Sequence, residues 1–274
     1  MTLMQRRFHT DELELGYVEG PARGQPVVFL HGTVSRWQLW LSVLPALAAQ
    51  IHVFAFDARG YGTSGRSPQH RYHYLDFVRE TVSFLRGVVR APAVLLGHSR
   101  GATVAMAVAA ESPELVTGLC LQEPTLRRRA MSGTPEQLTR MRDLIIAQDV
   151  PALAQLLLEV DPRQPLQEAL DRAENMTYMD PAAFAAFASG GAWDGLDADQ
   201  LARRLRCPTV IVTGDFAQGS VFNDAELDRL KSLNARVRVL RVVGARHRVH
   251  LSHPAECVGA CLQFVRALDV ASIP

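Results

Sequence analysis

The chain has 274 residues, which fits one large domain or two small ones at about 100 to 200 residues per domain. Its 29 Lys and Arg residues nearly balance 28 Asp and Glu residues, so the composition predicts no nucleic-acid and no membrane partner. Hydrophobic residues make up 48% of the chain and charged residues 21%, which is typical of globular proteins and excludes disorder.

No apolar run reaches the roughly 18 residues that cross a bilayer, and residues 1–15 lack the apolar core of a signal peptide. We therefore expect a soluble, cytoplasmic protein. Nearly all of the positive charge is arginine, because Lys231 is the only lysine. The arginines are scattered along the chain, and we interpret them as a result of codon usage rather than as a recognition surface.

Short apolar runs alternate with stretches of helical periodicity in the first and last parts of the chain. The expected strands, in chain order, are 13–19, 26–30, 51–56, 93–97, 115–122, 207–214 and 237–243. The expected helices are 37–49, 74–89, 101–110, 224–233 and 254–268. This alternation predicts an α/β fold with a mostly parallel central sheet flanked by helices.

The middle of the chain differs from both ends. Residues 125–203 have helical periodicity without convincing strands, and five prolines interrupt them. We interpret this stretch as an inserted helical cap, or lid. The core domain is then formed by residues 1–124 and 204–274.

The sequence Gly97-His98-Ser99-Arg100-Gly101 follows an apolar strand and opens a helix of small residues. The pattern GxSxG is weak by itself and also fits a glycine-rich turn. In this context it predicts a nucleophile elbow, a sharp turn that exposes a strained serine at the carboxyl end of the sheet. Ser99 is therefore the expected nucleophile.

A serine nucleophile needs a base, and His247 follows the last expected strand through a short loop. It would lie at the same edge of the sheet as Ser99. His250 and His253 follow at three-residue spacing, so a metal site is an alternative. No carboxylate or cysteine ligand accompanies these histidines, and we therefore interpret His247 as the general base.

A loop after the strand 26–30 carries His31, Gly32 and Thr33. Amides of Gly32 and Thr33, together with the amide of Arg100 after the nucleophile, would form an oxyanion hole. We place His31 next to the substrate. Without the other motifs, this segment would be only a turn at the end of a strand.

These motifs resemble the α/β-hydrolase family in order and spacing: His31-Gly32 after the first long apolar strand, residues 57–65, the elbow 97–101, and residues 244–254. The resemblance covers both ends of the chain and leaves out the cap. It implies the chain order nucleophile, acid, histidine, and an esterase or lactonase type of enzyme. Because the elbow holds a serine, the chain does not resemble the epoxide hydrolases and dehalogenases, whose nucleophile is a carboxylate.

The acid of the triad departs from the common pattern of the family. Many members carry it after the seventh strand in a G-x-x-D turn, but here Ala217 stands in that position and Asp215 lies two residues earlier. Glu123, at the end of the sixth expected strand, resembles the acid of fungal zearalenone lactonases and of some haloalkane dehalogenases. Adjacent strands lie about 4.8 Å apart, so Glu123 can still reach the histidine, whereas Asp215 is displaced by two positions from the usual place. We favour Glu123 and keep Asp215 as the alternative.

The expected cap concentrates large apolar side chains, which favour an apolar or aromatic ester or lactone over a sugar or a peptide. We expect the following cap residues to contact the substrate, although each would also suit packing against the core: Met176, Tyr178, Phe184, Phe187 and Trp193. Zearalenone lactonases place a cap tryptophan over the substrate, with a different spacing. The run 127–129 of three arginines could receive a carboxylate, but we interpret it as an exposed run.

The expected reaction is transfer of an acyl group from a neutral, apolar ester or lactone to Ser99 and then to water. It needs no metal and no organic cofactor. Two alternatives remain open at this point: a carbon–carbon bond hydrolase with the same triad, and a ligand receptor with negligible turnover. A homodimer is compatible with the sequence, as are substrate contacts of Arg100 and Arg246.

Overall fold

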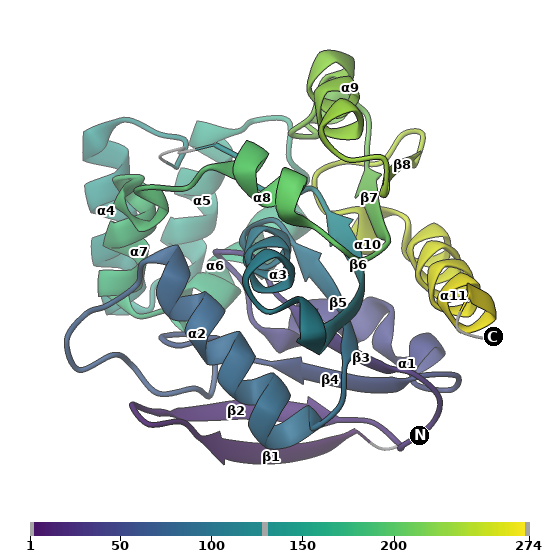
Figure 1. Cartoon of the computed structure of the whole chain (residues 1–274). Helices are drawn as coiled ribbons and strands as arrows, with labels where there is room; N and C mark the ends of the chain where they lie inside the picture. The colour runs from purple at the N-terminus through teal and green to yellow at the C-terminus, as the bar shows by residue number, and fades with distance from the viewer. Residues whose placement is uncertain (1–2, 128–130, 272–274) are drawn as a thin grey trace.

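The computed structural model describes residues 3–127 and 131–271 and centres on one eight-stranded sheet (Figure 1). The strand order is β1-β2-β4-β3-β5-β6-β7-β8. In this order all neighbours from β4 to β8 are parallel, whereas the pairs β1–β2 and β2–β4 are antiparallel. The strands are β1 (Met4–His9), β2 (Glu14–Glu19), β3 (Pro26–Leu30), β4 (His52–Phe56), β5 (Ala93–His98), β6 (Val116–Gln122), β7 (Thr209–Thr213) and β8 (Val237–Arg241). The predicted α/β fold with a mostly parallel sheet is confirmed.

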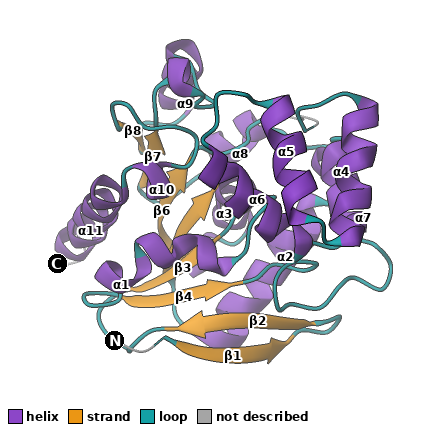
Figure 2. Cartoon of the chain, turned by 180° about the vertical axis from the view of Figure 1, so that it is seen from behind, coloured by secondary structure: helices purple, strands orange, loops and turns teal. Residues whose placement is uncertain are grey.

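Helices cover both faces of the sheet, as Figure 2 shows from behind. One face packs against α2 (Tyr74–Phe84), α3 (Arg100–Glu111) and α9 (Asp224–Leu233). The other face packs against α1 (Leu44–Leu47), α10 (Val249–Ser252) and α11 (Pro254–Ala271). Because strands β3 to β6 are covered on both faces, their sequences are continuous apolar runs rather than alternating patterns.

The structure differs from the predicted elements in three places. Strand β1 was not predicted, because its sequence MQRRFH is charged and exposed; it lies at the sheet edge and pairs with β2 alone. The expected helix 37–49 is a 3₁₀ helix at Trp37–Ser42 followed by the four-residue α1, with Pro45 in the first turn of α1. The expected helix 74–89 ends in a π-helical turn at Leu85–Val89.

Between β6 and β7 the chain forms a helical layer over the carboxyl end of the sheet (Figure 1). Its helices are α4 (Pro135–Ala147), α5 (Val150–Val160), α6 (Leu166–Thr177) and α7 (Pro181–Ala188), whereas α8 (Ala198–Arg204) packs against α3 and α9 and leads to β7. Backbone hydrogen bonds join this layer to the loop after β4: the Gly62 amide donates to the Tyr178 carbonyl at 2.9 Å, and the Asp180 amide donates to the Gly60 carbonyl at 2.7 Å. The layer is therefore held to the core next to the sheet edge that carries the predicted nucleophile.

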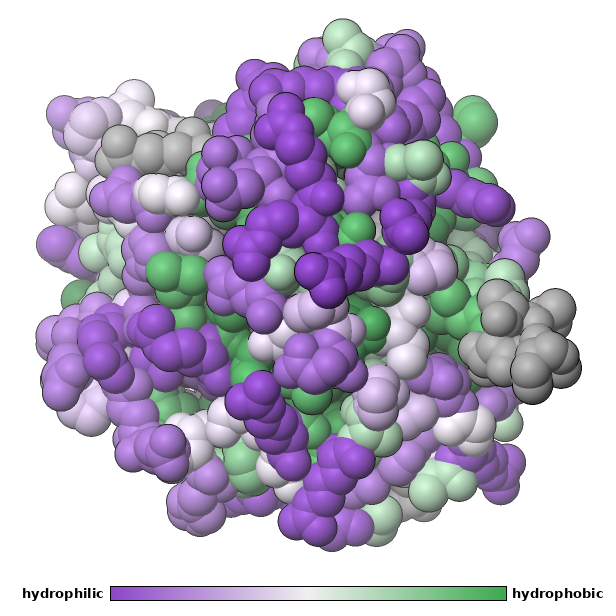
Figure 3. Space-filling model, in the orientation of Figure 1, coloured by the Kyte–Doolittle hydropathy of each residue, from purple (hydrophilic) through white to green (hydrophobic). Residues whose placement is uncertain are grey.

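Most side chains on the face seen in Figure 3 are hydrophilic, and apolar side chains reach the surface in small patches. In the described part of the chain, no helix is long and apolar enough to cross a membrane.

Candidate active site

The site lies where the carboxyl ends of three adjacent strands, β5, β6 and β7, meet. Backbone hydrogen bonds fix their ends relative to one another. The Ser99 amide after β5 donates to the Gln122 carbonyl of β6 at 2.9 Å, and the Glu123 amide donates to the Val212 carbonyl of β7 at 3.2 Å. Ser99 and Glu123 therefore leave the sheet at a common edge, with little freedom to shift along the strands.

Ser99 forms a strained turn between β5 and α3. Its φ of 51° and ψ of −115° lie outside the regions that L-residues ordinarily adopt. The turn requires glycine at Gly101, because a Cβ there would lie 2.1 Å from the Leu30 carbonyl oxygen of β3. Helix α3 can thus pass directly beside β3, and Ser99 stands at its N-terminus. This is the geometry of a nucleophile elbow.

His247 lies in the loop before α10 and faces the same cavity as Ser99. His98, next to the nucleophile, donates from Nε2 to the His247 carbonyl at 3.1 Å, and the two imidazole rings are 4.8 Å apart. The Ser99 hydroxyl is 3.3 Å from the Thr125 hydroxyl, and the structure shows no hydrogen bond between Ser99 and His247. Such catalytic bonds commonly tighten only around a bound substrate.

Glu123 is completely buried, and its Oε2 lies 3.3 Å from Nδ1 of His247. Four further donors, at 2.6 to 2.9 Å, are the Thr213 and Ser220 hydroxyls and the Gly214 and Val221 amides. Burial would raise the pKa of Glu123, but the hydrogen bonds from His247 and from the two hydroxyls outweigh burial and lower it. Glu123 is thus an ionised carboxylate in contact with Nδ1 of the His247 ring.

Asp215, the alternative acid, is partly exposed and has a different partner. Its Oδ2 accepts a hydrogen bond from the Gly244 amide at 2.6 Å, and its own amide donates to the Ala245 carbonyl at 2.9 Å. These bonds hold the loop that leads to His247. The structure shows no contact between the Asp215 carboxylate and the His247 ring.

The His31-Gly32 loop is fixed by the side chain of Arg100. This guanidinium is buried between the rings of Tyr61 and Phe77, at 4.5 and 4.3 Å from their centroids, and donates to the His31 and Gly32 carbonyls at 3.3 and 3.4 Å. In a trans peptide the N–H points opposite to the carbonyl, so the amides of residues 32 and 33 point away from Arg100. The Arg100 side chain therefore lies outside the cavity that Ser99 faces.

His31 takes part in the same arrangement and does not line that cavity. Its Nε2 accepts from the Ala58 amide at 3.1 Å, so Nδ1 of the neutral ring carries the proton and donates to the Gly32 carbonyl at 2.8 Å. Burial, followed by the charge of Arg100, holds the pKa of His31 well below its usual range. This histidine supports the loop rather than contacting a ligand in front of Ser99.

His247, His250 and His253 do not converge on one point. His250 is buried, with Nδ1 2.9 Å from Gln122 Oε1, whereas His253 is 2.9 Å from the Ser252 hydroxyl. Within residues 3–127 and 131–271, no three His, Cys, Asp or Glu side chains are arranged to hold a metal ion.

The cavity in front of Ser99 has two connected parts, which share Ser99, His247 and Arg172 in their walls. One part, which we call the apolar chamber, has a volume of about 250 Å³ and is bounded by Met131, Met141, Leu157, Phe187 and Trp193. The other, the charged chamber, has a volume of about 380 Å³ and is bounded by Asp161, Arg163, Glu168, Arg172, Arg246 and Arg248. Gly32 and Thr33 also line the charged chamber.

The cap residues predicted to contact a substrate divide into two groups. Phe187 and Trp193 line the apolar chamber. Met176 and Phe184 are packed in the core instead, and Tyr178 lies at the surface under the guanidinium of Arg36, 3.8 Å from its ring centroid. Sequence periodicity does not distinguish the cavity-facing side of a cap helix from the core-facing side, since both are apolar.

The arginines of the charged chamber were not predicted, except for Arg246. They come from α6, from the loop before it and from both sides of His247, so no local motif contains them. The one available signal was the placement of Arg246 and Arg248 directly beside His247. In the run 127–129, Arg127 is exposed and pairs with Glu226 at 2.8 Å, while the other two arginines lie outside the described residues.

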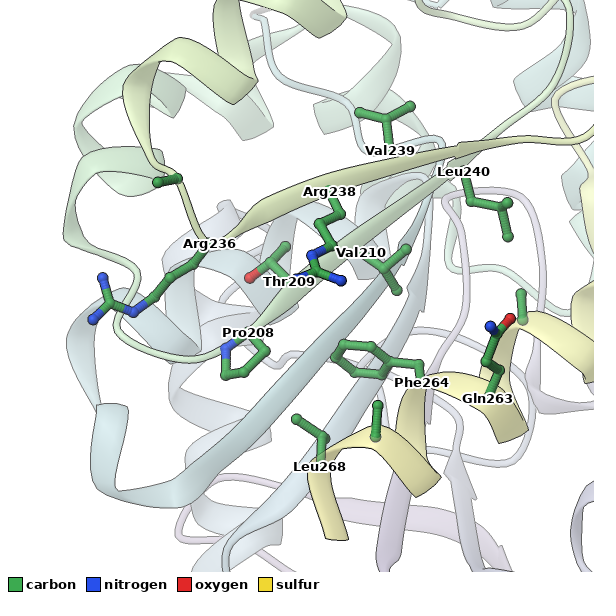
Figure 4. Close-up of a pocket in the computed structure, with 13 residues that line it drawn as sticks. Pro208, Thr209, Val210, Arg236, Arg238, Val239, Leu240, Gln263, Phe264 and Leu268 are labelled. Atoms are coloured by element: carbon green, nitrogen blue, oxygen red, sulfur yellow. The ribbon is translucent and has the colours of Figure 1, made fainter. Parts of the chain in front are cut away.

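A cavity larger than either chamber, of about 560 Å³, lies away from Ser99, between β7, β8 and α11 (Figure 4). Figure 4 shows Pro208 directly before β7, Val210 on β7 and Leu240 on β8, with Phe264 and Leu268 on the helix across the cavity. No serine, cysteine, histidine or acidic residue is among its described lining residues. Because its lining offers no general base to activate the Thr209 hydroxyl, the smaller cavity at Ser99 is the candidate active site.

Comparisons with known proteins identify the family and agree with the fold. The model of the alpha/beta hydrolase family matches residues 27–260. The 2-(acetamidomethylene)succinate hydrolase of Mesorhizobium japonicum is 25% identical over 272 residues, which cover 96% of each chain. A haloalkane dehalogenase of the same organism is 34% identical over 109 residues, which cover 40% of this chain and 35% of the dehalogenase. The crystal structure of the enol-lactonase from Burkholderia xenovorans LB400 has a TM-score of 0.76 at 18% identity and covers 95% of this chain and 100% of its own.

Proposed function

The chain belongs to the α/β hydrolase family and is a hydrolase, and we propose that it cleaves carboxylic esters or lactones through Ser99, His247 and Glu123. One observation carries the proposal: a strained serine shares a cavity with a histidine whose other nitrogen is 3.3 Å from a buried carboxylate. This is the relation among nucleophile, base and orienting acid that activates a serine hydroxyl. The apolar chamber would hold an apolar part of the substrate.

In the proposed reaction, Nε2 of His247 takes the proton of Ser99 as Oγ attacks the substrate carbonyl. The new C–O bond converts the carbonyl oxygen to an oxyanion, which the Thr33, Gly32 and Arg100 amides would stabilise. His247 then gives the proton to the leaving oxygen as its bond to carbon breaks. A water molecule, activated by the same imidazole, cleaves the acyl-enzyme and releases the acid. Glu123 holds the ring in the required tautomer and stabilises its cationic form.

Because the residue at the elbow is a serine, we do not propose the activity of the haloalkane dehalogenase relative for this chain. A haloalkane dehalogenase of the kind that displaces halide with a carboxylate would need an acid at the elbow, where this chain has Ser99. The match to that relative also spans only 35% of its length. Carbonyl chemistry on Ser99 fits the residues of this chain, and the enol-lactonase shares the same fold.

A fluorophosphonate probe tests the nucleophile directly. We expect one covalent adduct on Ser99, detected by intact mass, and none on Ser99→Ala; Ser232→Ala, at an exposed serine of α9, is the matched control and should label normally. A panel of aryl esters, alkyl esters and lactones then tests turnover. Labelling without turnover of any ester or lactone would contradict the proposal and would favour a receptor. A vinylogous diketone in the same panel tests carbon–carbon cleavage.

A further inference from the structure

The charged chamber contains more positive than negative charge. Four arginines line it, against two carboxylates, and both carboxylates already face arginines. Asp161 lies 3.3 Å from Nε of Arg163 and 3.8 Å from Nη2 of Arg246, and Glu168 lies 3.9 Å from Nη1 of Arg248. The walls therefore leave an excess of positive charge beside the nucleophile.

Arg172 is the arginine without a carboxylate partner: in the described part of the chain, no acidic side chain lies within 4.0 Å of it. Its Nη1 donates to the Gln164 Oε1 at 2.7 Å, and its Nε is buried without any hydrogen-bond partner. A guanidinium has five N–H donors in one plane, so most of its capacity is unused by the protein. Nη2 makes no hydrogen bond in the described part of the chain and, unlike Nε, is not closed off by protein, so it is free to bind a ligand in the chamber.

The remaining charges of the chamber do not neutralise Arg172. Burial lowers the pKa of Arg172, and the charge of Arg246 lowers it further, although Glu168 and Asp161 act in the opposite direction. Burial, and then the charge of Arg172, lowers the pKa of Arg248 to about 9, which still leaves a cation at neutral pH. Three guanidinium groups thus repel one another around a space that has room for an anion.

Arg172 also connects this space to the reaction centre. It belongs to α6 and lines both chambers, as do Ser99 and His247. A group bound by Arg172 and a carbonyl next to Ser99 therefore belong to one ligand of modest size. The apolar chamber would take the rest of that ligand, against Phe187 and Trp193.

We infer that the substrate carries a carboxylate, which Arg172 binds through its free guanidinium edge with Arg246 and Arg248 beside it. This inference rests on the proposed function, since it assumes that the same ligand presents its ester or lactone carbonyl to Ser99. A carboxylate matches the planar fork of a guanidinium with two parallel hydrogen bonds. The substrate is then an ester or lactone with an anionic end and an apolar body, which replaces the neutral substrate expected from the sequence.

Binding without catalysis provides the first test. Succinate, glutarate, adipate and inorganic phosphate are titrated by calorimetry into the wild-type protein, Arg172→Gln and Arg142→Gln. Arg142 is an exposed cap arginine that pairs with Asp143, so its variant is the matched control. We expect at least one dicarboxylate to bind the wild type and the control, and to bind Arg172→Gln about 10- to 100-fold more weakly. Arg172→Lys keeps the charge without the fork and should be intermediate.

Hydrolysis provides the second test. Monoethyl glutarate and ethyl pentanoate differ only in a terminal carboxylate or methyl group, and acid release is followed in a pH-stat. We expect kcat/KM for the half-ester to exceed that for the neutral ester by about 10-fold or more, mainly through KM. The preference should disappear in Arg172→Gln and persist in Arg142→Gln. Normal fluorophosphonate labelling of Ser99 shows that the variants are folded.

The outcomes separate the inference from the proposed function. Ester hydrolysis without a carboxylate preference, together with no dicarboxylate binding that depends on Arg172, would overturn the anion site and leave the serine hydrolase intact. Dicarboxylate binding that depends on Arg172, in a protein whose Ser99 resists the probe, would keep the anion site and reject the hydrolase. Tighter binding of phosphate than of every dicarboxylate would overturn the choice of a carboxylate.

Discussion

Strands β6 and β7 lie side by side, and each is followed by an acidic residue at the edge where Ser99 and His247 meet. Glu123 follows β6 and Asp215 begins the loop after β7. Glu123 is completely buried, and its carboxylate contacts the His247 ring. Asp215 is partly exposed, and its carboxylate contacts the backbone of the loop before His247, at the Gly244 amide.

The comparison shows that two neighbouring acids can support one histidine in different ways. Glu123 has a φ of 51°, an unfavourable conformation for a residue other than glycine, and the protein maintains it with five hydrogen bonds to the carboxylate. Asp215 has no such strain and shapes the path of the loop. We propose that the first acid acts on the protonation of the imidazole, whereas the second acts on its position.

The largest expected effect is that of Glu123→Gln. Glutamine has the same shape but no charge, so the His247 ring loses the partner that selects its tautomer and stabilises its cation. We expect kcat to fall by about 10⁴-fold, as for loss of the acid in a related triad. Steady-state hydrolysis of the best ester measures the effect, and circular dichroism checks the fold. If Asp215→Asn lost this much activity and Glu123→Gln did not, the roles of the two acids would be reversed.

Ser220→Ala leaves Glu123 in place and tests the hydrogen bond that its carboxylate accepts from Ser220. The Ser220 hydroxyl is buried and donates to Oε1 at 2.7 Å. A hydrogen bond to a charged group is worth about 1.5–3 kcal/mol, of which the neighbouring Thr213 hydroxyl can recover part. We expect kcat to fall by about 10-fold. Ser232→Ala removes an exposed hydroxyl and should not change kcat; an equal loss in both variants would contradict this role of Ser220.

The pH dependence of stability tests whether Glu123 is ionised in the folded protein. The pKa of Glu123 is lowered in the folded protein from the ordinary value of 4.5, so its ionised form stabilises the fold above that pH. This contribution decreases as the pH falls below 4.5 and through the lower pKa of the folded state. Urea unfolding of the wild type should therefore show a steeper loss of stability in this window than unfolding of Glu123→Gln. Parallel curves would show that Glu123 is not ionised preferentially in the fold.

Much of this architecture is readable from local sequence. Apolar patterns predicted the strands from β2 to β8, most clearly those from β3 to β6, because a strand buried on both faces has a continuous apolar sequence. The charged edge strand β1 has no such signal, and its position depends on its partner β2. The elbow at Ser99 is also local, since a turn between strand and helix is specified by five adjacent residues.

The charged chamber could not be predicted from local sequence. Arg172 and Arg248 are 76 positions apart and meet only because α6 folds over the loop that carries His247. Four of the scattered arginines that suggested codon usage in the sequence thus converge in three dimensions. In the same way, Phe187 faces the cavity and Phe184 faces the core, although they lie on the same helix, α7.

The smallest expected effect is that of Asp215→Asn, which tests whether Asp215 holds the loop before His247. The asparagine oxygen can still accept the hydrogen bond from the Gly244 amide, but without the charge that roughly doubles its strength. We expect a loss of about 1 kcal/mol or less in the free energy of unfolding and less than about a threefold change in kcat. Asp215→Ala removes the acceptor altogether, so the loop should loosen and both stability and KM should change more than in Asp215→Asn. Equal behaviour of the two variants would mean that the Gly244 hydrogen bond does not position His247, and that the β7 acid has no part in the site.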